Sequence, residues 1–349
     1  MPILLPANQP PNSFYRGGPQ IRQFRFTEPA SSDPRPDYQS EDWIASTTPC
    51  RGSRPLGLTK LPDGRWLADA VVAKPMHWLG PAHVAAFGVD TKLLVKLLDA
   101  GQRLPIHIHP EESWVKEHIS GATHGKAEAW YVLTGGTVYL GLQQDVDADT
   151  LQQLVLQQDT SALLKKMHRF DVRPHQTIYV PPATLHAIGE GVLVVEVQEP
   201  ADMSVLLEWT DFQIDGAEEG HLGVGWDAAL TAVDRKGRSR AEMECLVVDN
   251  NITPASADAT RIGVFAKTSE AFFRMERVQL QSDKNTQTLP RGFAVVIVLE
   301  GSLELATEKS GALSLVKGNT ALVAYGDGNF TLKGAGQTLV ARPPKVGGS

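Results

Sequence analysis

The sequence from Gly101 to Pro110 is Gly-Gln-Arg-Leu-Pro-Ile-His-Ile-His-Pro, and it places His107 and His109 two residues apart in an apolar, β-favouring run. On a strand, residues at this spacing point to the same face of the sheet. Two imidazoles on the inner face of a strand are suited to bind a metal ion. The stretch therefore predicts a strand of a β-rich domain that carries two metal ligands.

Two further stretches complete a pattern of four ligands. Glu128 begins the strand-like run Glu-Ala-Trp-Tyr-Val-Leu, which ends at the turn that begins with Gly135, and His186 follows a Val-Pro-Pro turn. Three imidazoles and one carboxylate suit Zn²⁺, and they also suit Fe²⁺, Mn²⁺ or Ni²⁺. We predict one divalent ion per chain, with zinc expected first, held by His107, His109, Glu128 and His186.

The composition is that of an ordinary globular protein of 349 residues, long enough for two domains. Its formal net charge of −7 argues against a nucleic-acid or anionic-membrane surface. No run approaches the roughly 18 apolar residues of a membrane span. The two cysteines, Cys50 and Cys245, form no CxxC motif, and prolines interrupt the apolar N-terminal run. We therefore expect reduced thiols and a cytoplasmic protein.

The N-terminal three quarters of the chain divide into three parts. Residues 1–92 are expected to form an irregular and partly helical arm that packs on a first barrel. Residues 93–210 are expected to form that metal-binding barrel. A helical insertion is expected near 145–170, where the spacing of apolar residues becomes that of a helix. Residues 211–261, which are rich in glycine and charge, are expected to connect the barrel to the C-terminal part.

The C-terminal part, residues 262–349, alternates like strands between glycine-containing turns. Its segment Val298-Leu-Glu-Gly-Ser-Leu resembles the segment Val132-Leu-Thr-Gly-Gly-Thr-Val of the first half. Such an internal repeat favours a second barrel. Because no histidine follows His221, this barrel is expected to be metal-free. The predicted fold class is all-β with small helical insertions, in two β-barrel or jelly-roll domains.

The ligand positions and their flanking residues match the two signatures of the cupin superfamily, with Ala183 in place of a glycine. Within residues 93–199, three blocks also resemble type I phosphomannose isomerases: 93–110, 124–131 and 185–199. The resemblance implies a bicupin fold and a zinc ion. It also implies the interconversion of aldose and ketose 6-phosphates, of the mannose 6-phosphate and fructose 6-phosphate type.

Matched motif by motif, the four metal ligands of that family fall on the four positions given above, and its Gln ligand falls on His107. Its active-site lysines fall on Lys96 and Lys126. Its arginine, which follows a Gln-Glu-Ser-Ser-Asp segment, falls on Leu206. A leucine cannot bind a phosphate, because phosphate recognition needs fixed cationic donors.

The leucine at position 206 leaves two alternatives open for the substrate. Either another cation reaches a phosphate, for example Arg16, Lys96 or a residue of the run 234–238, or the substrate is not phosphorylated. The family resemblance favours the phosphate, whereas the residue at position 206 favours its absence.

Three further residues are candidates for the catalytic chemistry. Lys126 precedes Glu128 by two residues, so on a strand both face the same cavity, and an amine there suits general acid–base transfer. Glu196 lies in an apolar run, where an unpaired carboxylate is costly. It is a candidate base, and the alternative is a structural role in which it holds the residues of the site in place. Lys96 is expected to point inward, to contact substrate hydroxyls or to pair with a carboxylate.

The leading functional hypothesis is a metal-dependent aldose–ketose isomerase that acts on a hexose or hexose phosphate through a cis-enediolate. The only partner expected is a small sugar or sugar phosphate. One alternative is a metal-dependent cupin oxygenase of a small organic substrate. Another is a carbohydrate-binding cupin without turnover. The sequence does not define the oligomeric state.

Overall fold

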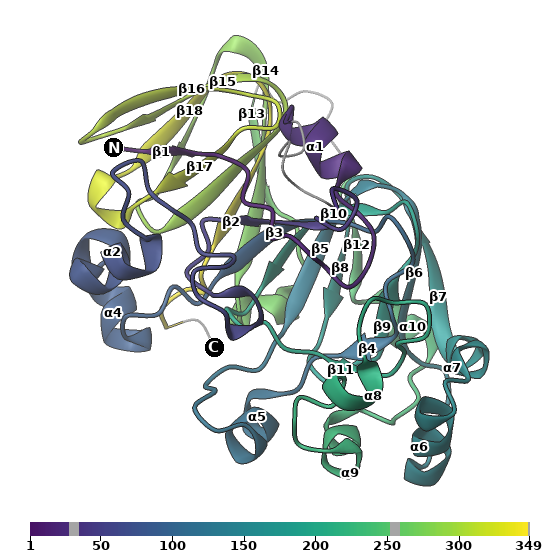
Figure 1. The fold of residues 1–349 in the computed structure, drawn as a ribbon. Coiled ribbons are helices and arrows are strands. Elements are labelled where there is room, and N and C mark those ends of the chain that lie inside the picture. Colours follow the sequence, from purple (N-terminus) through teal and green to yellow (C-terminus); the bar gives the residue numbers. More distant parts are fainter. Residues whose placement is uncertain (28–34, 252–258, 348–349) are drawn as a thin grey trace.

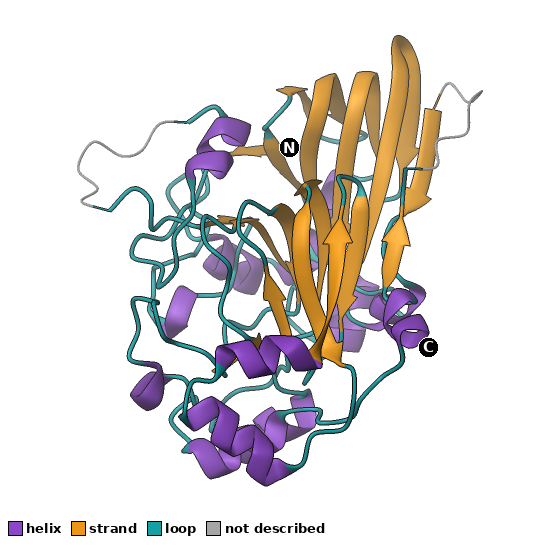
Figure 2. Cartoon of the chain, turned by 90° about the vertical axis from the view of Figure 1, so that its right-hand side faces the viewer, coloured by secondary structure: helices purple, strands orange, loops and turns teal. Residues whose placement is uncertain are grey.

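A computed structural model describes residues 1–27, 35–251 and 259–347, and in these residues the strands form three antiparallel sheets of six, five and seven strands. Two sheets belong to the first half, and the third comes mainly from the C-terminal half and lies beside them (Figure 1). Most helices gather at the end of the molecule away from the long C-terminal strands (Figure 2). The predicted all-β fold with small helical insertions is confirmed.

The six-stranded sheet is the central layer, with strand order β12-β8-β5-β10-β3-β2. It is buried on both faces, so that β10, Leu-Val-Val-Glu-Val-Gln, has no exposed residue. A sheet that is covered on both sides explains why these strands are nearly continuous apolar runs. Its strands are β2 (Glu41–Ile44), β3 (Leu94–Asp99), β5 (Glu128–Thr134), β8 (Gln176–Val180), β10 (Leu193–Gln198) and β12 (Val247–Asp249).

The five-stranded sheet, in the order β11-β4-β9-β6-β7, faces the central sheet and forms a sandwich with it. An apolar cluster between the two sheets includes Leu98, Trp130 and Val194 from the central sheet and Val138 and Ile188 from the facing sheet. The facing strands are β4 (His107–Ile108), β6 (Gly136–Leu142), β7 (Met167–Val172), β9 (His186–Ile188) and β11 (Val205–Leu206).

The seven-stranded sheet has the order β1-β17-β15-β18-β14-β13, and β16 pairs with β15. Its long strands enclose a second apolar core that includes Leu303, Leu305, Leu315, Phe330 and Leu332. The bicupin arrangement and the domain boundaries stay predictions. The strands are β1 (Ile3–Leu5), β13 (Ala259–Gly263), β14 (Arg274–Leu289), β15 (Ala294–Thr307), β16 (Gly311–Val316), β17 (Thr320–Val323) and β18 (Phe330–Arg342).

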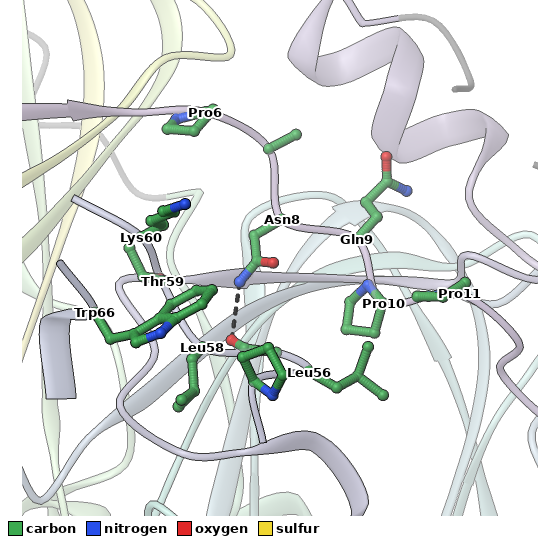
Figure 3. A pocket seen from close by; sticks show the side chains of 13 residues that line it. Pro6, Asn8, Gln9, Pro10, Pro11, Leu56, Leu58, Thr59, Lys60 and Trp66 are labelled. Carbon is green, nitrogen blue, oxygen red and sulfur yellow. Dashed lines mark hydrogen bonds between the residues drawn. The ribbon is translucent and has the colours of Figure 1, made fainter. Parts of the chain in front are cut away.

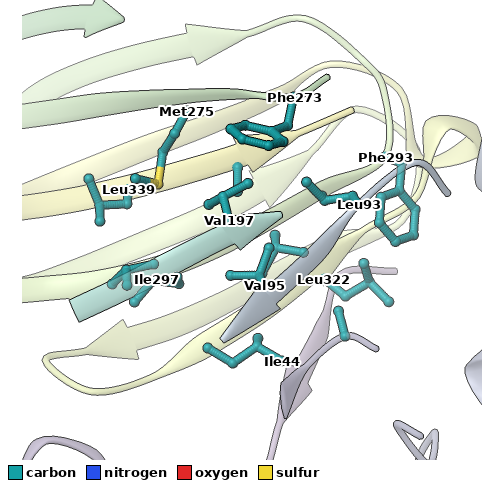
Figure 4. Packing of buried hydrophobic residues seen from close by; sticks show 14 of the residues in the cluster. Ile44, Leu93, Val95, Val197, Phe273, Met275, Phe293, Ile297, Leu322 and Leu339 are labelled. Carbon is teal, nitrogen blue, oxygen red and sulfur yellow. The ribbon is translucent and has the colours of Figure 1, made fainter. Parts of the chain in front are cut away.

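The two halves share a further apolar core, which lies between the central sheet and the C-terminal sheet (Figure 4). Val95 and Val197 project from the central sheet toward Met275, Ile297 and Leu339 of the C-terminal sheet. Complete burial of each such side chain contributes about 1.5–3 kcal/mol. The opposite face of β3 and β10 is therefore left for the site inside the sandwich.

The helices are short and connect or cover the strands. Asp147 and Asp159 cap two of them within 145–170, α6 and α7, by accepting backbone N–H groups. The α-helices are α1 (Pro19–Arg25), α2 (Leu67–Ala73), α3 (Pro75–Trp78), α4 (Pro81–Phe87), α5 (Glu112–His118), α6 (Ala148–Leu156), α7 (Thr160–Lys166), α8 (Gly216–Glu219), α9 (Trp226–Ala229) and α10 (Arg240–Glu244). The 3₁₀ turns are η1 (Cys50–Gly52), η2 (Leu230–Ala232), η3 (Lys267–Ala271) and η4 (Tyr325–Asp327).

The N-terminal arm adds strands to both halves, because β1 pairs with β17 and β2 pairs with β3. Arg25 ties the arm to both sheets: its Nε lies 3.0 Å from the buried carboxylate of Asp42, and its Nη1 donates to the carbonyl of Gly318 at 2.6 Å. The arm also approaches Gly101 so closely that a Cβ there would lie 2.8 Å from the Cα of Gly17.

Within the described ranges, we find no helix with the length and apolar character that crossing a membrane requires.

Candidate metal centre

Strand alternation directs a set of ionisable side chains into the sandwich. On β3 and β10, Val95, Leu97, Val195 and Val197 pack toward the C-terminal sheet. The residues between them, Lys96 and Glu196, therefore face the interior of the sandwich, where both line a cavity. All seven residues predicted for the site are less than one-tenth exposed: Lys96, His107, His109, Lys126, Glu128, His186 and Glu196.

The three predicted histidine ligands converge on one point. Their ring nitrogens lie within 4.8 Å of one another. The ring centroids of His107 and His186 are 4.0 Å apart, and each lies 4.9 Å from that of His109. The pairing of β4 with β9 sets His107 directly opposite His186. The strand register therefore brings together imidazoles that are far apart in the sequence.

Backbone carbonyl groups fix the orientation of all three rings. Each Nδ1 atom lies 2.9 Å from a carbonyl oxygen: that of Pro105 for His107, of Met203 for His109 and of Thr184 for His186. A carbonyl only accepts, so each Nδ1 carries the proton and each Nε2 keeps its lone pair. Histidine ligands of metals are held in the same way by outer hydrogen bonds.

Glu128 brings a carboxylate to the same point. Its Oε2 lies 2.9 Å from Nε2 of His109, and its Oε1 lies 3.3 Å from Nε2 of His186. The Nε2 of His186 is buried and has no hydrogen-bond partner among the described residues. An acceptor without a donor is costly in such a place, and a metal ion satisfies it. The donor set therefore fits a divalent cation.

Electrostatics keep these groups in the form that binds metals. Burial and the neighbouring imidazoles lower the pKa of His107 well below its usual value. Burial, together with the ammonium group of Lys126, lowers the pKa of His109 to about 3. Burial alone would raise the pKa of Glu128, but Lys126 and His109 outweigh it and lower this pKa. His107 and His109 are thus neutral imidazoles and Glu128 is a carboxylate, the forms that metal binding requires.

Each of the two lysines lies beside carboxylates of the site. Nζ of Lys126 is 3.0 Å from Glu128 Oε2 and 2.8 Å from Nε2 of His109. Nζ of Lys96 is 3.4 Å from Glu41 Oε2 and 3.6 Å from Glu196 Oε1. Burial opposes the charge of Lys96, but Glu41 and Glu196 raise its pKa overall, so Lys96 stays protonated.

The pKa of Glu196 lies close to neutral pH. Burial and the carboxylate of Glu128 raise its pKa to about 7, against the opposing effect of Lys96. A buried carboxylate with a pKa near neutrality is suited to take and return a proton. Glu196 also points inward, as the sequence predicted, because it lines the cavity.

The N-terminal arm supplies site residues that the sequence motifs did not indicate. Glu41 accepts hydrogen bonds from the hydroxyl of Tyr15 and from Nε1 of Trp43, each at 2.7 Å. The ring of Trp43 also lies 4.4 Å from Nζ of Lys96, because β2 sets Trp43 opposite Lys96. Only the pairing of β2 with β3 reveals these contacts. A charged pair, Glu41-Asp42, beside a tryptophan was the one local signal.

The cavity beside the metal centre is small, about 70 Å³ in volume. A larger hollow of about 470 Å³ lies elsewhere, where Asn8 donates a hydrogen bond to the carbonyl of Gly57 (Figure 3). Lys60 is its single charged residue, so it offers no comparable chemistry. Besides Asn8 and Lys60, the residues that line it include Pro6, Pro10, Leu56 and Trp66.

Fold and site together define a β-sandwich protein with a buried group of ligands for a metal ion. No protein-family model matches the chain. Over 243 residues it is 26% identical to a mannose-6-phosphate isomerase of Streptococcus mutans, covering 67% of this chain and 71% of that protein. It is also 26% identical to mannose-6-phosphate isomerase ManA of Bacillus subtilis, covering 71% of this chain and 74% of that protein.

A solved structure shares the fold over nearly the whole chain. The crystal structure of the mannose 6-phosphate isomerase from Bacillus subtilis superimposes with a TM-score of 0.73 at 21% identity, covering 97% of this chain and 99% of that one. The chain is thus similar in sequence to proteins named mannose-6-phosphate isomerase, as its motifs predicted, and it shares the fold of a solved one.

Proposed function

We propose that this protein is a metal-dependent aldose–ketose isomerase that acts on a hexose or hexose phosphate through a cis-enediolate of the sugar. The single observation that carries the proposal is the buried convergence of three imidazoles with a carboxylate, beside a lysine and a second carboxylate. The similarity to proteins named mannose-6-phosphate isomerase supports the same reaction class.

The proposed ligands of the metal are His107, His109, Glu128 and His186. When bound, a divalent ion, zinc by expectation, supplies a Lewis acid for the sugar oxygens at C1 and C2. The cysteine-free donor set also suits Fe²⁺, Mn²⁺ and Ni²⁺. The Nδ1 atoms of these imidazoles are already bonded, so their Nε2 atoms are the proposed ligand atoms, although that of His109 lies 2.8 Å from Nζ of Lys126.

The chain's own groups then serve proton transfer. Lys126, within 3.0 Å of Glu128, is placed to exchange a proton with a sugar oxygen bound at the centre. Glu196, with its pKa near 7, is the proposed base that moves the proton between C1 and C2. Lys96, held between Glu41 and Glu196, keeps the base in position and is the proposed contact for sugar hydroxyls.

The reaction class is tested by isotope exchange. The metal-loaded protein is incubated in D₂O with a panel of aldoses and their 6-phosphates, and deuterium at C2 is followed by NMR. Exchange with formation of the ketose is expected for at least one sugar. Tight sugar binding without exchange would instead support a binding protein, and stoichiometric iron with oxygen consumption would support an oxygenase.

A further inference from the structure

The charges of the residues that line the cavity bear on which substrate it can bind. Its described lining contains only two cations, Lys96 and Lys126, against four carboxylates, which belong to Glu41, Glu128, Glu196 and Asp202. Both ammonium groups already lie within 3.6 Å of carboxylates. Even with a bound dication, this lining has no excess positive charge for a phosphate dianion.

The layer of side chains next to the proposed metal ligands is apolar. Along β3, Leu98 follows Lys96 on the same face, and along β9, Ile188 follows His186 in the same way. With about 3.3 Å per residue in a strand, this layer lies about 7 Å from the ligand layer. Leu98 and Ile188 pack in one cluster with Leu104, and all three line the cavity. A phosphate held there would lose its water without gaining a partner.

Position 206 continues this apolar wall. Leu206 lies in β11 directly opposite His107, and its side chain is buried and lines the cavity. A side chain here therefore stands beside a proposed metal ligand and lines the cavity. The leucine instead offers only methyl groups, which recognise no charge.

The other candidate cations outside the cavity lining are engaged with partners of their own. Arg103 makes a bidentate ion pair with Glu208, so the pair has no net charge. Arg16 is exposed, and its Nε donates to Gln102. In the run 234–238, Arg238 pairs with Asp234 at 2.9 Å, and Lys236 lies 3.5 Å from Asp145. None of these cations lines the cavity.

The segments outside the described ranges add no cation, since residues 28–34, 252–258 and 348–349 contain neither lysine nor arginine. We therefore infer that the site selects an uncharged hexose over its 6-phosphate. The inference rests on the proposed isomerase function and names the substrate class within it. The apolar layer would pack against the C5–C6 end of the sugar, while the hydroxyls near C1 and C2 meet the charged groups.

The test compares mannose with mannose 6-phosphate on the metal-loaded wild-type protein, using kcat/KM from C2 deuterium exchange. A kcat/KM at least tenfold higher for mannose is expected. Equal values, or a preference for the phosphate, would overturn the inference and leave the isomerase function standing. Exchange with neither sugar nor any other of the panel would overturn the isomerase function, and the inference with it.

A pair of variants at position 206 sharpens the test. Leu206→Arg should move the kcat/KM ratio toward the 6-phosphate by about tenfold or more, since charge-assisted bonds to phosphate are strong, and should make inorganic phosphate a competitor of mannose. Leu206→Met, of similar volume, should keep the wild-type ratio. Metal content is measured for both variants. Strong competition by inorganic phosphate in the wild type would contradict the inference, even if Leu206→Arg does not fold.

Discussion

The sandwich of the first half and the C-terminal sheet are both built from antiparallel strands, yet they fill their interiors differently. Between the central and facing sheets, ionisable side chains such as Lys96, Glu128 and Glu196 are nearly inaccessible to water. The apolar cluster enclosed by the C-terminal strands includes Leu303, Leu305 and Phe330, and buried ionisable residues of that half, such as Arg277 and Arg342, lie outside this cluster. The side chains of the proposed site all lie in the first of these two interiors.

The contrast shows what it takes to keep charges inside a β-sandwich. Buried charges of the site have opposite charges nearby, as Lys96 has with Glu41 and Glu196 and Lys126 has with Glu128. A charged group without such a partner would be neutralised or would destabilise the fold by several kcal/mol. The C-terminal core needs no such compensation, and it supports the central sheet from behind through a shared apolar layer.

The largest expected effect on turnover comes from removing the anionic ligand. Glu128→Gln keeps the shape of the side chain but takes away its charge, so we expect metal loss on dialysis and a fall in kcat/KM of about 10³-fold or more. Elemental analysis and the exchange assay measure both. Glu199→Gln, a buried glutamate that does not line the cavity, is the matched control and should retain metal. Firm metal retention in Glu128→Gln would exclude Glu128 as a ligand.

A smaller effect is expected from Lys126→Ala, which should lower kcat by about 10²-fold if the amine transfers a proton. Metal content should not change, because the lysine is not a ligand. Lys92→Ala, which removes a lysine outside the cavity, should leave kcat unchanged. A nearly intact kcat in Lys126→Ala would assign this lysine a structural role only.

The dependence of kcat/KM on pH tests whether Glu196 is the base. Glu196 must be ionised to accept a proton, and its pKa is raised to about 7, so kcat/KM should rise with pH up to this value and fall about tenfold per unit on the acid side. A bound dication stabilises the carboxylate, so the midpoint should lie at pH 7 or below. Among the neighbouring side chains, the carboxylates of Glu128 and Glu41 raise the pKa of Glu196, whereas Lys96 and Lys126 lower it.

Glu196→Gln is the variant that decides this assignment. Without an ionisable group at the position, the protein should lose both most of its turnover and the acid limb of the pH profile. If the limb persists unchanged in Glu196→Gln, another group with a pKa near 7 controls the rate.

The sequence predicted which of these side chains share a face, because spacing carries that information locally. His107 and His109 share a face at an interval of two residues, and Lys126 and Glu128 do the same. The contribution of the arm was not predictable, because it depends on pairing over long sequence distances: β2 joins β3 across about 50 residues, and β1 joins β17 across more than 300. No local pattern marks which edge strand an arm will join. The apolar layer of the cavity was likewise visible only once the strands were in register.

The smallest effect on turnover should follow from a large cavity in the C-terminal core. Phe330 is 1% exposed and belongs to that core alone. Phe330→Ala should lower the free energy of unfolding by about 3–5 kcal/mol, since it removes buried surface and leaves a void. Denaturant unfolding measures this loss, and Phe330→Leu should show a smaller one. Because the residue contacts no site group, metal content and kcat of the folded protein should stay at wild-type values for both variants. A loss of metal from folded Phe330→Ala would show that the C-terminal core also positions the ligands, and the division between a chemical and a supporting half would then be wrong.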